Sequence, residues 1–167
     1  QNAQEYFERL EAKANSLKVG TIASVIGRYF AMDRDNRWDR TQKAYDMIVE
    51  GKGTQVNSWR DALKNSYNNN KTDEFIEPHV ITKNNEPIAK VQDGDVVLFY
   101  NYRGDRAVQI SHAFEDDKFP QFKRRDLNNV LFVGFSNYEK GVVMNRAKED
   151  IEEAGSESNL VKSMMKD

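Results

Sequence analysis

The chain has 167 residues, of which 38% are hydrophobic and 31% charged, and this composition suits one compact soluble domain with a single core. Its 25 basic and 27 acidic residues give a net charge of −2, which argues against a broad basic surface for nucleic acid or anionic lipid. The absence of cysteine excludes disulfides, thiolate nucleophiles and Cys-ligated metal sites. No segment reads as a signal peptide or a membrane span, so we expect a cytoplasmic protein.

The first quarter of the chain combines a helical pattern, an apolar segment and a highly charged one. Apolar residues at three- and four-residue spacing predict an amphipathic helix over residues 1–18 with one buried stripe. The β-branched, apolar segment Thr21–Gly27 predicts a buried strand. The next segment, Arg28–Arg40 ("RYFAMDRDNRWDR"), carries four arginines and three aspartates, and we expect it to form a loop.

The middle of the chain is predicted to be helical and then to return to a strand. Apolar spacing predicts a helix over about residues 36–50, ended by glycine at positions 51 and 53, and a second helix over 58–67. Turns at 68–73 and around 84–87 enclose a short predicted strand over 79–82.

The following segment repeats the order of strand, arginine and helix. A turn at Asp93–Gly94 precedes an apolar strand over 96–100, then Arg103, and then a helix that reaches about Phe114. Another strand is predicted over 130–135. Strands separated by helices indicate an α/β fold with helices on the faces of a sheet. The polar residues 142–167 are predicted to be a helical tail or linker beyond a domain of residues 1–141.

Both arginine-rich segments are expected at strand ends, where ligands collect in α/β sheets. Arg34 and Arg40 flank the start of one predicted helix, and Arg103 and Arg106 lie three residues apart at the start of another. Guanidinium groups bind the oxygens of phosphate and carboxylate with two parallel hydrogen bonds. The four arginines therefore predict a site for a small molecule with two anionic groups.

Ion pairing is the alternative interpretation of these arginines. Asp33, Asp35, Asp39 and Asp105 lie among them, and charge-rich loops usually form solvated networks of this kind. The presence of two similar segments at two strand ends favours the anion site.

Other functions have less support in the sequence. Aromatic residues of the first arginine segment could stack on nucleic-acid bases, but the acidic balance of the chain argues against it. His79 and His112 belong to no spaced group of ligands, and we find no phosphate-binding loop or nucleophile motif. These observations predict a binding protein without catalytic residues of its own.

Two long motifs, "SVIGRYFAMDRDNRWDRTQKAYDMIVEGKG" and "DGDVVLFYNYRGDRAVQIS", resemble the cofactor-independent (2,3-bisphosphoglycerate-independent) phosphoglycerate mutases. The resemblance extends from about residue 1 to 137. It implies a three-layer α/β/α fold with a mixed sheet, which is the substrate-binding, or phosphotransferase, domain of that family. In those enzymes this domain is inserted into an alkaline-phosphatase-like domain that carries a serine nucleophile and two metal ions, usually manganese. Together they interconvert 3-phosphoglycerate and 2-phosphoglycerate through a phosphoserine.

The resemblance also implies roles for individual residues. The substrate-binding arginines of the family fall on four positions of this sequence: Arg34, Arg40, Arg103 and Arg106. They would clamp the carboxylate and phosphate of phosphoglycerate and reorient the glycerate while its phosphate rests on the serine. Arg28 and Arg37 share the first motif, and we expect them to pair with the aspartates.

The serine nucleophile and the metal ligands of the family have no counterpart in this sequence. We therefore expect a chain with no catalytic residue, metal site or cofactor of its own. It would be either a fragment of a longer enzyme or a natural short relative. We also expect it to be a monomer. Its expected partners are phosphoglycerate and the phosphatase-like domain of the same enzyme, and not nucleic acid or a membrane. The alternative is a stand-alone anion-binding or protein-interaction module that reuses the fold.

Overall fold

The computed structural model describes residues 2–134 and residue 138; the predicted tail, 142–167, lies outside the described residues. In chain order the elements are α1 (Ala3–Leu17), β1 (Ser24–Val25), α2 (Arg28–Ala31), α3 (Trp38–Glu50), β2 (Thr54–Val56), α4 (Trp59–Asn68), the 3₁₀ turn η1 (Asp73–Phe75), β3 (His79–Lys83), β4 (Glu86–Pro87), β5 (Val96–Phe99), the 3₁₀ turn η2 (Gly104–Arg106), α5 (Val108–Glu115) and β6 (Leu131–Gly134).

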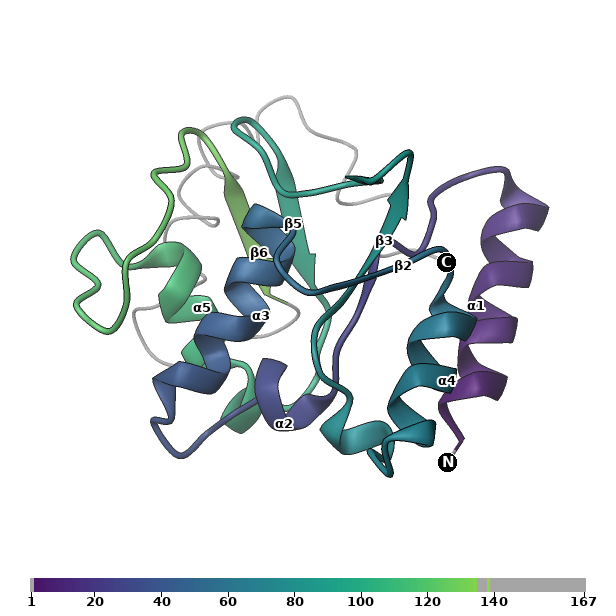
Figure 1. The fold of residues 1–167 in the computed structure, drawn as a ribbon. Helices are drawn as coiled ribbons and strands as arrows, with labels where there is room; N and C mark the ends of the chain where they lie inside the picture. The colour runs from purple at the N-terminus through teal and green to yellow at the C-terminus, as the bar shows by residue number, and fades with distance from the viewer. Residues whose placement is uncertain (1, 135–137, 139–167) are drawn as a thin grey trace.

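The strands lie between two groups of helices, which confirms the predicted α/β fold. Strand β3 pairs antiparallel with β1 and β4 and parallel with β2, so the sheet is mixed. Strands β5 and β6 pair parallel with each other and form a separate two-stranded sheet within the described residues. Figure 1 shows α1 and α4 on one side of β3, and α2, α3 and α5 on the other.

The core consists of two clusters, one for each group of helices. One surrounds Trp59 of α4 and includes Val25, Val56 and Ile81 from the strands. The other joins α3 to α5 around Tyr45, whose ring lies 5.1 Å from that of Phe114. Burying each large apolar side chain of this kind stabilises the fold by about 2 kcal/mol. The second cluster fixes how α3 and α5 lie against each other.

Two predicted helices are confirmed, and local signals explain their ends. Helix α3 ends at Gly51, which takes the left-handed conformation with φ of 71°. Helix α4 begins after Ser58, whose side-chain oxygen accepts a hydrogen bond from the backbone N–H of Asp61. None of the helices in the described part of the chain is long and apolar enough to span a membrane.

The predicted buried stripe of the first helix is wrong. No residue of α1 is buried, and Tyr6, Leu10 and Leu17 are each more than half exposed. The helix contacts α4 through Phe7, whose ring stacks on Trp59 at 5.2 Å, and through Glu11, which accepts hydrogen bonds from Trp59 and Arg60. The amphipathic pattern is present, but packing against α4 covers only part of it.

The predicted strand over 21–27 and the predicted loop over 28–40 are also only partly right. The strand is limited to Ser24–Val25, because the chain then bends toward η1, where the N–H of Gly27 donates to the carbonyl of Ile76 at 2.7 Å. The charged segment begins with the short helix α2 and ends inside the first turn of α3, so only its middle is a loop.

Candidate functional site

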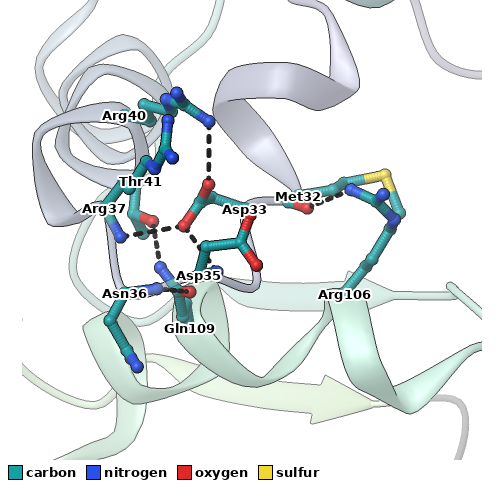
Figure 2. Close-up of polar contacts among 9 residues, drawn as sticks. All are labelled: Met32, Asp33, Asp35, Asn36, Arg37, Arg40, Thr41, Arg106 and Gln109. Carbon is teal, nitrogen blue, oxygen red and sulfur yellow. Dashed lines mark hydrogen bonds and ion pairs between the residues drawn. The ribbon is translucent and has the colours of Figure 1, made fainter.

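The two arginine segments lie against each other, as the sequence predicted. The loop between α2 and α3 meets η2 and the start of α5. Nη1 of Arg34 donates to Oδ2 of Asp105 at 2.7 Å, and Nη1 of Arg106 donates to the carbonyl of Met32 at 3.0 Å. Figure 2 shows the second of these contacts together with the bonds made by Gln109 of α5.

Arg40 is held by a buried carboxylate. Its Nη1 donates to Oδ1 of Asp33 at 3.1 Å, and its guanidinium lies 3.7 Å above the ring centre of Tyr29. The side chains of Arg40 and Asp33 are 12% and 2% exposed. Contacts on two sides therefore fix the direction in which Arg40 presents its remaining donors.

Asp33 stays charged despite its burial. Burial alone would raise the pKa of this carboxyl, but hydrogen bonds from the backbone N–H groups of Arg37 and Asp35, from Gln109, and the charge of Arg40 together lower the pKa. The backbone bonds, at 2.9 and 3.0 Å, also wrap the loop around the carboxylate. At neutral pH a negative charge thus lies just ahead of α3, where the positive end of the helix dipole favours it.

Three of the predicted arginines act on one carboxylate, that of Asp105. Its pKa is lowered first by the hydrogen bond from Arg34 and then by the charges of Arg34, Arg103 and Arg106. Arg34 and Arg103 are exposed, and Arg106 is partly buried. The site therefore combines accessible guanidinium groups with the carboxylate of Asp105, which already engages Arg34.

The family model described as "BPG-independent PGAM N-terminus" matches residues 1–140. The chain belongs to this phosphoglycerate mutase family. The predicted resemblance is confirmed.

Individual relatives agree with the family model. The chain is 46% identical over 139 residues to the 2,3-bisphosphoglycerate-independent phosphoglycerate mutase of Clostridium beijerinckii and 50% identical over 143 residues to that of Desulforudis audaxviator. These matches cover 83% and 85% of this chain but only 27% and 28% of the relatives. The chain thus spans little more than a quarter of the length of the mutases that it matches.

A solved structure supports the fold. A phosphoglycerate mutase of Leishmania mexicana, determined at low cobalt concentration, is similar with a TM-score of 0.75 and 29% sequence identity. The similarity covers 80% of this chain and 26% of that chain. The α/β architecture of this chain is therefore that of part of a mutase.

The mutase resemblance implies two metal ions in the whole enzyme, and the described residues offer no place for them. No group of three or more His, Asp or Glu side chains that could hold a metal ion occurs among residues 2–134 and 138. The donor set does not fit a metal, so no step at this site is assigned to one.

Several predictions about the arginines need correction. Arg34 and Arg40 do not follow a strand directly, because α2 lies between β1 and their loop. Arg28 pairs with Glu74 at 2.9 Å and not with an aspartate. Arg37 is exposed, and the bond to Asp33 comes from its backbone N–H. Arg34 and Arg40 themselves do form ion pairs, so the pairing interpretation describes their geometry correctly.

Sequence reasoning missed Gln109 and Thr41. Both are buried, and Nε2 of Gln109 donates to Oγ1 of Thr41 at 3.0 Å, joining α5 to α3. The available signal was a polar residue inside the apolar pattern "AVQISHAF", because a buried amide requires partners.

Proposed function

We propose that this chain is the substrate-binding part of a phosphoglycerate mutase that interconverts 3-phosphoglycerate and 2-phosphoglycerate. In this proposal Arg34, Arg40, Arg103 and Arg106 bind the phosphate and the carboxylate of the substrate. The observation that carries it is that Arg34 of one segment donates to the carboxylate of Asp105 at 2.7 Å, and Asp105 lies between Arg103 and Arg106 in the sequence of the other segment. An anion of similar size can take the same donors.

The arginines would act by position and charge. Arg40, fixed between Asp33 and Tyr29, is suited to hold one anionic group in a constant direction. Arg34 and Arg103 are exposed and can move onto a second group. Together they would hold the glycerate while its phosphate is on the serine of the phosphatase-like part, which in this proposal also carries the two manganese ions.

The rest of the proposal concerns the whole protein. Residues 1–141 would form the phosphoglycerate-binding unit, and residues 142–167 would be a polar tail or linker. The partner would be the phosphatase-like domain, and a glycolytic role would place the protein in the cytoplasm. The coding sequence on both sides of this chain is expected to contain a serine and metal ligands in the same reading frame.

Calorimetric titration of the chain with 3-phosphoglycerate tests the proposed site. Replacement of Arg34 or Arg103 by alanine should weaken binding by about 1–3 kcal/mol, the value of a lost charge-assisted hydrogen bond. Arg60→Ala is the matched control, because Arg60 is similarly exposed, at 54% against 51% for Arg34, and pairs with Glu11 at 2.9 Å in another part of the fold.

Equal affinity in all three variants would contradict the assignment of the arginines. Absence of binding by the folded wild-type chain at millimolar ligand would count against an autonomous site and favour the alternative of an interaction module.

A further inference from the structure

We propose that Gln109 is a positioning residue. It holds the two arginine segments in a fixed relative position, called their register below, so that their guanidinium groups converge on one anion. The proposal rests on the proposed function for the identity of that anion. Gln109 itself is buried, at 5% exposure, and is not expected to touch the substrate.

The amide of Gln109 bonds to Asn36 and Asp33 of the first arginine segment and to Thr41, which directly follows it. Its Oε1 accepts the backbone N–H of Asn36 at 2.8 Å, and its Nε2 donates to Oγ1 of Thr41 at 3.0 Å (Figure 2). A backbone N–H can only donate, so the Asn36 bond fixes which end of the amide is oxygen. Gln109 lies three residues after Arg106 and therefore ties the loop that carries Arg34 to the segment that carries Arg106.

Consecutive backbone amides of the loop point at just two acceptors. The N–H groups of Asp35 and Arg37 donate to Asp33, and the N–H between them, that of Asn36, donates to Gln109. Asn36 has a left-handed backbone with φ of 57°, which asparagine tolerates better than most residues. Asp33 belongs to the loop itself, so Gln109 is the acceptor that relates the loop to the other segment.

The other bonds described between the segments come from the arginines. Arg34 reaches Asp105, and Arg106 reaches the carbonyl of Met32. Both bonds use guanidinium groups that the proposed function assigns to the substrate, so binding can weaken them. The Gln109 bonds involve no arginine; the bond to Thr41 is buried and the bond to Asn36 is part-buried, so they can remain when the substrate binds. Gln109 therefore adds polar contacts that can hold the segments in both states to the apolar cluster that joins α3 and α5.

The test uses the whole chain and reads the register of the segments from the pKa of Asp105, measured by carbon-13 NMR. In the wild type Arg34 lowers this pKa by hydrogen bonding, and Arg103 and Arg106 add their charges. Arg34→Gln gives the reference for complete loss of the Arg34 contact. Gln109→Leu removes the bonds to Asn36, Thr41 and Asp33 at similar size. It should shift the pKa of Asp105 most of the way to that reference and weaken 3-phosphoglycerate binding about tenfold.

Two controls separate positioning from stability. Ile81→Val lowers stability in the other core cluster and should leave the pKa of Asp105 and the affinity unchanged. Thr41→Val removes only the Thr41 bond and should shift the pKa of Asp105 part of the way, whereas Thr41→Ser, which keeps the hydroxyl, should restore the wild-type value. This pair decides the question even if Gln109→Leu does not fold.

An unchanged pKa of Asp105 in Gln109→Leu, or equal values in Thr41→Val and Thr41→Ser, would overturn the proposal, even if the unfolding temperature falls. If the wild-type chain binds no 3-phosphoglycerate, the proposed function fails. The pKa of Asp105 still shows whether Gln109 sets the register.

Discussion

Arg34 and Asp105 form an ion pair at 2.7 Å although they lie 71 residues apart in the chain. Both side chains are about half exposed, so the pair contributes little to stability. The pair matters for binding, because the carboxylate of Asp105 occupies the Arg34 guanidinium that the proposed substrate would need. Asp105 can therefore be regarded as an internal anion at the proposed site.

Replacing Asp105 by asparagine should strengthen 3-phosphoglycerate binding. The substitution leaves Arg34 without a competing carboxylate, and release from an exposed ion pair should raise the affinity by at most about fivefold. Calorimetry at low and high salt checks the result, because the gain should shrink as salt screens the charges. Weaker binding by Asp105→Asn would instead mean that Asp105 orients Arg34 toward the substrate.

Replacing Asp33 by asparagine should destabilise the fold near neutral pH, by about 3 kcal/mol, because Arg40 loses its buried partner. The native pKa of Asp33 is below the ordinary value of 3.8, so its contribution to stability is present above that pH. The contribution is lost as pH falls from 3.8 through the native pKa. Denaturant unfolding at pH 7 and below pH 3 should show the variant and the wild type converging in acid, whereas a constant difference would refute this origin.

Replacing Tyr67 by phenylalanine should loosen the start of α1. The hydroxyl of Tyr67 donates to Oδ1 of Asp73 at 2.6 Å, while Oδ2 accepts the backbone N–H groups of Asn2 and Ala3. We expect a loss of about 1 kcal/mol, measured by thermal unfolding, and faster amide exchange in the first turn of α1. Unchanged exchange in that turn would show that Tyr67 does not support Asp73.

The contact between Tyr67 and Asp73 should also be visible in the titration of Tyr67. Burial, and then the hydrogen bond and the charge of Asp73, raise the pKa of Tyr67 to about 12. Alkaline titration followed by tyrosine absorbance should therefore lose its latest-titrating step in Tyr67→Phe. If Tyr67→Phe leaves that step in place, a different tyrosine is responsible for it.

Replacing Gly27 by alanine should destabilise the base of the arginine segment. A Cβ at this position would lie 2.2 Å from the carbonyl oxygen of Glu74, so η1 or α2 must move. We expect a loss of about 2 kcal/mol in denaturant unfolding, as for other overpacked positions. Gly20→Ala is the control, because nothing lies within 4 Å of its Cβ and only its φ of 69° opposes the change. A smaller loss at Gly27 than at Gly20 would contradict the close approach.

Local signals in the sequence were sufficient for several features. Gly51 ends α3 because a left-handed residue closes the last turn, and Ser58 begins α4 because its side chain satisfies a free backbone donor. The two long motifs identified the family, and the arginines within them marked the two segments that meet. Each of these features depends on residues that are close in the chain or on a recognisable motif.

The tertiary structure decided which partners these residues have. The sequence allowed any arginine to pair with any aspartate, but packing of α3 on α5 buries Asp33 beside Arg40 and brings Asp105 to Arg34. It also places Gln109 against Asn36, which no local pattern predicted. The helical pattern of α1 correctly predicted a helix but not its exposure. Periodicity records which side chains share a face, whereas burial depends on which distant segments cover that face.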